Sequence, residues 1–279
     1  MPINPSEYPL ADAEALHKFL SKNGLGANKS LGQHFLCSVP VASAIVEATG
    51  DARGILEIGP GPGVLTGPLS MRAEKMVALE LDGRMLGLLA KSAPKVQIFA
   101  VDALKADLRS ILQTLPKPRA IVSNLPYYIT GPLIARIADV RQLISVAILM
   151  MQREVADRIC AASHNSDRGA VSVALQEQFD ISLVCQVLAS AFVPPPKVQS
   201  TVLRFEPRAE LLDEALFLAF VRKGFSQPRK TLVNNLLTGQ VSKERTADAL
   251  TSLKLDERIR PHALSAAEWK SLYQLLGVA

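Results

Sequence analysis

From residue 54 onward the chain alternates short apolar runs with amphipathic stretches, and this alternation restricts the fold more than any other feature. The apolar runs are GILEIG (54–59), KMVALE (75–80), VQIFAV (96–101), RAIVSN (119–124) and SVAILMM (145–151). Amphipathic stretches separate them at 64–72, 82–92, 105–115 and 132–140. Strands that alternate with helices build parallel sheets, and strands that are apolar almost throughout are covered on both faces. The pattern therefore predicts an α/β fold with a mainly parallel sheet.

The segments on either side complete this expectation. Helical spacing predicts helices at 11–22, at 39–49 after the N-cap Ser38, at 153–161 and at 169–178. ISLVCQVLAS (181–190) and STVLRFEP (200–207) predict a closing strand pair at one sheet edge. Residues 213–276 show helical periodicity without strand runs. We therefore expect two domains, an α/β domain over 1–207 and a small all-helical domain over 208–279.

Composition excludes several classes of protein. The three cysteines lie far apart without the spacing of zinc ligands, which predicts neither disulfides nor a metal site. The N-terminus carries acids early and has no apolar region typical of a signal peptide. The longest apolar run, LISVAILMM at 143–151, is about half of the ~20 residues that a membrane span requires. We expect a cytoplasmic protein that does not associate with membranes.

The charge distribution favours an anionic partner. The net charge is +5, and VRKGFSQPRK (221–230) holds Arg222, Lys223, Arg229 and Lys230 with no acid among them. Such a cluster is typical of a contact with phosphate or nucleic acid, although a solvated helix end has the same composition. The segment predicts an RNA or phosphate contact, with the solvated end as the alternative.

Glycines and acids follow three successive predicted strands. Gly59, Gly61 and Gly63 come directly after the first strand, and Val64 stands where a dinucleotide fingerprint requires glycine. Glu80 ends the second strand and suits a ribose, while Asp102 ends the third and suits an adenine amine. Each acid alone is also typical of a helix N-cap or of the first turn of a helix. Together they predict a nucleoside pocket without a phosphate cradle, which suggests S-adenosylmethionine and a class I methyltransferase.

The fourth strand ends in Asn124, Leu125, Pro126 and Tyr127. This segment resembles the Asn/Asp/Ser-Pro-Pro-Tyr signature of methyltransferases that act on exocyclic amino groups, with Leu125 in place of the first proline. An adenine N6 is a poor nucleophile, and two acceptors for its hydrogens orient it for attack. We expect the Asn124 side-chain oxygen and the Leu125 carbonyl, fixed by Pro126, to be these acceptors. Tyr127 would stack on the extruded base.

Six segments together resemble one family. NKSLGQHFL (28–36), LEIGPGPGVLT (56–66), ALELD, VDAL, SNLPYYI and FVPPPKVQS (192–200) are similar in order and spacing to the ribosomal RNA adenine dimethyltransferases. The match runs from about residue 28 to 207. Within this family the chain most resembles the bacterial members that dimethylate two adjacent adenosines near the 3′ end of 16S rRNA and that contribute to small-subunit biogenesis. The erythromycin-resistance methyltransferases, which act on 23S rRNA, are the nearest alternative.

The resemblance implies a role for each matching residue and a seven-stranded, Rossmann-like sheet. It implies cofactor contacts from His34, Leu36, Gly59, Gly61, Glu80, Asp102 and Asn124. It implies a catalytic set of Asn124, Leu125, Pro126, Tyr127 and Phe192, with Phe192 as a second aromatic surface, although a lone Phe before prolines more often packs in a core. Contacts with 16S rRNA in the small subunit or its precursor are expected from Lys29, Lys197, Arg222, Lys223, Arg229 and Lys230. A monomer is expected.

Three residues depart from the commoner family pattern. His34 and Tyr128 stand where many members have asparagine, and Gln199 stands where aspartate is common. None removes a group that methyl transfer needs. Two other functions fit part of the sequence: a non-catalytic RNA-binding assembly factor, from the basic segment, and an NAD-dependent dehydrogenase, from the glycine turn and Glu80. Methyl incorporation and cofactor titration distinguish the three.

Overall fold

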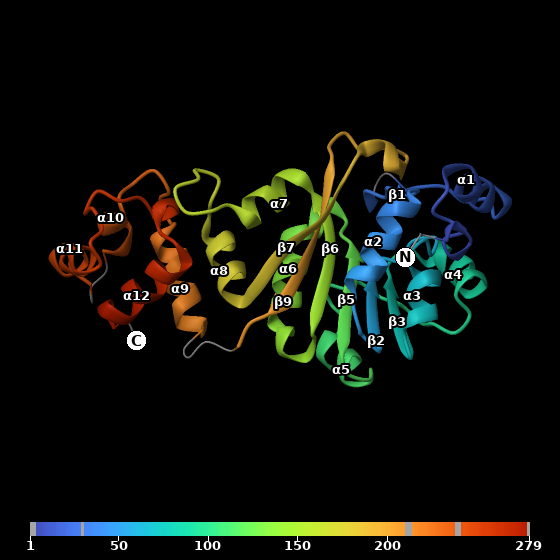
Figure 1. The fold of residues 1–279 in the computed structure, drawn as a ribbon, viewed down its shortest axis with the longest axis horizontal. Helices are drawn as coiled ribbons and strands as arrows, with labels where there is room; N and C mark the ends of the chain where they lie inside the picture. Colours follow the sequence, from blue (N-terminus) through green and yellow to red (C-terminus); the bar gives the residue numbers. More distant parts are fainter. Residues whose placement is uncertain (1–3, 29–30, 210–213, 238–240, 278–279) are drawn as a thin grey trace. The chain divides into compact units, whose positions relative to one another are not determined.

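A computed structural model describes residues 4–28, 31–209, 214–237 and 241–277. The chain divides into two compact units. The first holds residues 1–153 and 181–207, and the second holds 154–180 and 208–279. Figure 1 shows the strands of the first unit side by side with helices along them. Among the described residues, no helix has the length and apolar character needed to cross a membrane.

A seven-stranded sheet is the centre of the first unit. Its strand order is β4-β3-β2-β5-β6-β9-β7. The strands from β2 to β6 pair in parallel, whereas β9 runs antiparallel to β6. Their bounds are β2 Gly54–Ile58, β3 Lys75–Glu80, β4 Gln97–Ala100, β5 Arg119–Asn124, β6 Val146–Gln152, β7 Phe179–Val187 and β9 Ser200–Pro207. The predicted fold, including the closing pair at one edge, is confirmed.

Helices separate the strands as the periodicity predicts. They are α1 Ala13–Lys22, α2 Val39–Ala48, α3 Thr66–Arg72, α4 Leu86–Ser92, α5 Leu108–Gln113 and α6 Thr130–Asp139. The apolar sides of α1, α2, α3 and α4 join the sheet in one core, in which Leu16, Ile45, Leu69 and Leu89 are almost fully buried. Burial of such side chains is the main stabilising contribution to a fold of this kind. The parallel arrangement brings the carboxyl ends of β2, β3, β4 and β5 to one edge.

Two helices between β6 and β7 belong to the second unit. These are α7 (Arg153–Cys160) and α8 (Ala170–Gln178), both within the sequence range assigned above to the first domain. Val173 of α8 is buried in the apolar cluster of the C-terminal helices. Amphipathic spacing shows that a helix has an apolar face but not which core this face joins. The expected boundary at 207 coincides with one of the three points where the chain passes between the units, and the functional division stays a prediction.

The C-terminal helices of the second unit are α9 (Glu214–Gly224), α10 (Leu232–Leu236), α11 (Lys243–Ser252) and α12 (Ala266–Leu276). Trp269 is fully buried among them, stacked on Phe225 with ring centroids 5.4 Å apart. Ser265 and Glu268 form a capping box that begins α12. These helices form a core of their own.

A second, two-stranded sheet joins distant parts of the first unit. β1 (Phe35–Leu36) pairs antiparallel with β8 (Phe192–Val193). Two-residue strands are too short to show periodicity, so the sequence does not predict this pairing. The sheet connects the loop before α2 to the segment that follows β7.

Candidate functional site

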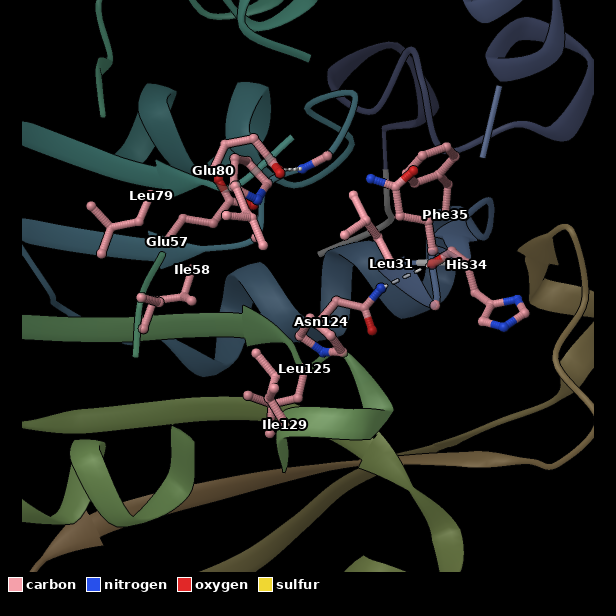
Figure 2. A pocket seen from close by; sticks show the side chains of 18 of the residues that line it. Leu31, His34, Phe35, Glu57, Ile58, Leu79, Glu80, Asn124, Leu125 and Ile129 are labelled. Carbon is pink, nitrogen blue, oxygen red and sulfur yellow. Dashed lines mark hydrogen bonds between the residues drawn. The ribbon is translucent and has the colours of Figure 1, made fainter. Parts of the chain in front are cut away.

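A pocket opens at the carboxyl edge of the seven-stranded sheet. The ends of β2, β3, β4 and β5 contribute residues 57–62, 79–81, 101–103 and 124–129, and the loop at 31–36 closes another side. Figure 2 shows Glu57, Glu80 and Asn124 on three of these strand ends, with His34 on the loop. Ligands bind at this edge in open α/β sheets.

The turn after β2 requires glycine. Gly59 and Gly61 have φ angles of +72° and +56°, a backbone region that other residues rarely adopt. A Cβ atom at Gly61 would also lie 3.2 Å from Cε1 of Phe35. The N–H of Gly61 donates to Oε2 of Glu80 at 2.9 Å, so the turn is bonded to the end of β3.

Glu80 is oriented by backbone donors. Besides the bond from Gly61, its Oε1 accepts from the N–H of Asp82 at 2.7 Å, and the residue is 5% exposed. Burial raises the pKa of Glu80, although these two N–H donors oppose the shift. A carboxylate keeps further acceptor positions when each oxygen accepts one bond. Glu80 can therefore still accept from a pair of hydroxyl groups.

Asp102 lies at the pocket after β4. Its Oδ1 accepts from the N–H of Leu104 at 2.9 Å, which is the local capping bond that such a residue also makes without a ligand. The side chain is half-buried and lines the pocket. Its second oxygen is thus the one available for a ligand amine.

Asn124 has its side-chain amide oriented by the loop. The Nδ2 group donates to the carbonyl oxygen of His34 at 3.2 Å. Because a carbonyl oxygen can only accept, this bond requires the NH₂ group on the side of His34 and places Oδ1 on the other side (Figure 2). The acceptor that Asn124 turns away from the loop is therefore an oxygen, as orientation of an amine requires.

Tyr127 follows in the turn after β5 and is half-buried. Its hydroxyl shares a hydrogen bond of 2.8 Å with Oγ of Ser200, and its ring stacks on His34 with centroids 5.8 Å apart and planes at 25°. Burial raises the pKa of the Tyr127 hydroxyl. The preceding Leu125 is held by its N–H, which donates to the Met150 carbonyl at 2.9 Å.

The loop before α2 is fixed by bonds to separate parts of the first unit. Nε2 of Gln33 donates to Oδ2 of Asp82 at 3.0 Å. Nδ1 of His34 lies 2.7 Å from the carbonyl oxygen of Pro194. With the β1–β8 pairing and the Asn124 bond, these contacts hold the loop beside the pocket.

Most of the predicted site residues meet in this pocket. It is lined by His34, Leu36, Gly59, Gly61, Glu80, Asp102, Asn124, Leu125, Pro126 and Tyr127. Phe192 is not among the lining residues: it pairs with Leu36 across the small sheet and is 3% exposed within the core. Its position matches the core-packing alternative.

None of the described residues that are predicted to contact RNA is among those that line the pocket. Lys197 of the first unit is exposed, as are Arg222, Lys223, Arg229 and Lys230 of the second. Lys29 lies outside the described residues.

Glu57 is a pocket residue that the sequence analysis missed. It lies in β2, is 2% exposed, and its Oε2 has no hydrogen-bond partner among the described residues. Burial raises the pKa of Glu57 from 4.5 to about 8, the neighbouring Thr66 hydroxyl opposes this shift, and the Glu80 charge adds to it. An acid inside the apolar run GILEIG was the available signal, because an acid in a strand covered on both faces is rarely tolerated without a role.

We expect this pKa to make stability depend on pH. Between about pH 4.5 and 8 the folded chain keeps the Glu57 proton and the unfolded chain has lost it, so stability falls as pH rises. The slope for one group is about 1.4 kcal/mol per pH unit, or about 3 kcal/mol between pH 5.5 and 7.5. Urea unfolding of wild type and Glu57→Gln at both pH values measures the free energy of unfolding. This free energy should fall with rising pH in wild type, and the fall should be absent in Glu57→Gln.

Glu74→Gln is the matched control, because Glu74 is exposed and paired with Arg53. It should keep the wild-type pH dependence. Equal pH dependence in wild type and Glu57→Gln would contradict the buried, protonated state of Glu57.

The pocket fits an adenosyl cofactor with an amino acid end. The glycine turn leaves room at the backbone, Glu80 offers acceptors for a ribose, and Asp102 offers one for an exocyclic amine. Glu57 adds a buried carboxyl oxygen without a hydrogen-bond partner among the described residues, which suits a polar group of a ligand. Fold and strand ends together define a class I S-adenosylmethionine-dependent methyltransferase.

Comparison with known proteins specifies the family. The model of the family "Ribosomal RNA adenine dimethylase" matches residues 24–277. A ribosomal RNA small subunit methyltransferase A of Geobacillus thermodenitrificans is 38% identical over 93% of this chain and 94% of its own length. The protein of the same name from Shouchella clausii is 38% identical, covering 96% and 95%. The chain therefore belongs to the ribosomal RNA adenine dimethylase family, as the six segments indicated.

Solved structures agree with this assignment. A dimethyladenosine transferase from Plasmodium falciparum superposes with a TM-score of 0.74 at 25% identity, covering 88% of this chain and 99% of that one. The 23S rRNA methyltransferase ErmE superposes with a TM-score of 0.69 at 24% identity, covering 88% and 100%. The second likeness shows the shared fold alone.

Proposed function

We propose that the chain transfers methyl groups from S-adenosylmethionine to N6 of two adjacent adenosines in the 3′-terminal hairpin loop of 16S rRNA, dimethylating both. The observation that carries this proposal is the Asn124 amide, whose bond to His34 turns Oδ1 away from the loop, in a pocket that Tyr127 also lines. An acceptor next to an aromatic ring suits an extruded base with an amino group.

The residues of the pocket would act by positioning. The cofactor supplies an electrophilic methyl group on a sulfonium centre, and Glu80, Asp102 and the glycine turn would hold it. Oδ1 of Asn124 and the carbonyl of Leu125 would accept the two N6 hydrogens and direct the nitrogen lone pair to the methyl group. The proton leaves after the nitrogen becomes cationic and acidic, so water suffices as its acceptor.

The small subunit is favoured as the substrate by the relatives. Those with 38% identity over nearly their full length are named small subunit methyltransferases. The resemblance to the 23S rRNA enzyme is at the level of fold. An enzyme that modifies ribosomal subunits would act in the cytoplasm, and we propose that it acts there as a monomer, because one chain supplies the described residues that line the pocket.

The test is methyl incorporation from labelled S-adenosylmethionine into small subunits that lack these modifications. We expect four methyl groups per subunit, on two neighbouring adenosines, and none on large subunits. Methylation of 23S rRNA would point to the alternative substrate. Binding of small subunits without incorporation would instead support a non-catalytic assembly factor.

We expect the basic segment of the second unit to bind RNA phosphates. Arg229 and Lys230 are exposed, so Arg229→Gln with Lys230→Gln should weaken binding of small subunits with little loss of stability. The slope of log affinity against log salt should fall in magnitude by about 1.5 for two lost contacts. Filter binding at several salt concentrations measures this slope.

Lys18→Gln with Lys22→Gln is the matched control. It removes the same charge from exposed positions of α1. If both double variants keep the wild-type slope, the segment does not contact phosphates.

A further inference from the structure

The residue after Tyr127 has no part in the proposed chemistry, yet it is placed at the pocket. Tyr128 lines the pocket and is 57% exposed. Its ring lies against the loop, since a Cβ atom on Gly32 would be 3.6 Å from its Cδ1. Water-exposed aromatic surface beside a binding pocket is typical of a contact that a ligand completes.

The two consecutive tyrosines cannot serve the same base in the same way. Residues 127–129 form a 3₁₀ turn, in which successive side chains point about 120° apart. Tyr127 is directed to Ser200 and His34 by its hydroxyl bond and its ring stacking. Tyr128 therefore presents its ring in a different direction.

The other aromatic residues near the pocket are covered. Phe35 and Phe192 are 6% and 3% exposed, and Tyr127 is half-buried. Among the described residues that line the pocket, Tyr128 is thus the exposed aromatic ring. Phe192, expected to be the second aromatic surface for the target, is not among the residues that line the pocket.

We propose that Tyr128 stacks on the base next to the target adenosine and so positions the RNA strand. This inference rests on the proposed function, in which two adjacent adenosines are modified in turn. When one adenine is extruded and lies at Asn124, the base next to it in the RNA loses its stacking partner on that side. An exposed ring beside the pocket would replace this lost stacking. Stacking depends on the ring and tolerates different bases, with purines stacking more strongly than pyrimidines.

The test combines variants of Tyr128 with substitutions of one of the two adenosines in the RNA. Small subunits are prepared in which one of the two adenosines is replaced by guanosine or by uridine, and methylation of the other is measured. For wild type, the KM for subunits with guanosine should be several-fold lower than for subunits with uridine. In Tyr128→Ala this ratio should approach one, and KM for unchanged subunits should rise by roughly 5- to 30-fold, which corresponds to about 1–2 kcal/mol of stacking.

Three further measurements separate stacking from a structural effect. Tyr128→Phe and Tyr128→Trp should retain the wild-type KM, because they keep an aromatic face. In Tyr128→Ala the Tm, the Kd for S-adenosylmethionine and kcat at saturating subunits should stay close to wild type. A guanosine-to-uridine ratio that persists in Tyr128→Ala, or a KM in Tyr128→Phe as high as in Tyr128→Ala, would overturn the proposal. Absence of methylation by wild type would instead overturn the proposed function.

Discussion

Asn124→Ala is expected to lower kcat for methylation of small subunits by about 100- to 1000-fold, the usual effect of removing one oriented group that acts on the reacting centre. The variant loses the Oδ1 acceptor for the target amine and also the bond to the His34 carbonyl. Single-turnover methylation at saturating cofactor and subunits measures the change. The Kd for S-adenosylmethionine should change less than kcat, because the other strand ends still hold the cofactor.

Tyr127→Ala should abolish methylation, while cofactor binding largely persists. Asn23→Ala is the matched control for Asn124, because it removes an amide of the same size from the C-cap of α1, where Nδ2 of Asn23 donates to the Phe19 carbonyl. This control should keep full activity. Full activity in both pocket variants would contradict the assignment of the fourth strand end to the target base.

Glu80→Gln is expected to weaken binding of S-adenosylmethionine by about 10- to 100-fold, since hydrogen bonds to a charged group contribute about 1.5–3 kcal/mol. Both carboxylate oxygens accept from backbone N–H groups, at Gly61 and Asp82. The amide of the variant places an NH₂ group against one of these donors, so the turn is displaced as well. Isothermal titration of the purified chain with S-adenosylmethionine measures the Kd.

Glu74→Gln is again the matched control, because Glu74 directly precedes β3 whereas Glu80 ends it. It should leave the Kd unchanged. Titration with NAD should give no binding in any of these proteins. A wild-type Kd in Glu80→Gln would show that Glu80 does not hold the cofactor.

The strands and their ends could be predicted because each is determined by residues that are close together in the sequence. KMVALE and RAIVSN match β3 and β5 at both ends. In a parallel sheet, residues at successive carboxyl ends lie at one edge, so the sequence alone predicts that Gly59, Glu80 and Asn124 lie together. Local pattern and sheet topology together predict most of the pocket.

Other features depend on contacts that the sequence pattern does not show. The β1–β8 pairing joins residues about 157 positions apart through two-residue strands, and it buries Phe192 instead of directing it to the pocket. The hydrogen bond from Asn124 goes to the backbone carbonyl of His34. Every residue carries a backbone carbonyl, so the residue type at position 34 does not indicate this bond. Glu57 was not predicted because its neighbours in the strand are apolar. Strand periodicity indicates which face of the sheet a side chain lies on, but not whether that side chain reaches a pocket.

The most direct test of the central claim is mass spectrometry of nuclease-digested 16S rRNA from cells that lack this chain. We predict that the fragment with the two adjacent adenosines near the 3′ end lacks all four methyl groups. The wild-type chain should restore both dimethyladenosines, and Asn124→Ala should not. Fully dimethylated adenosines in cells without the chain, or their restoration by Asn124→Ala, would contradict the proposed function.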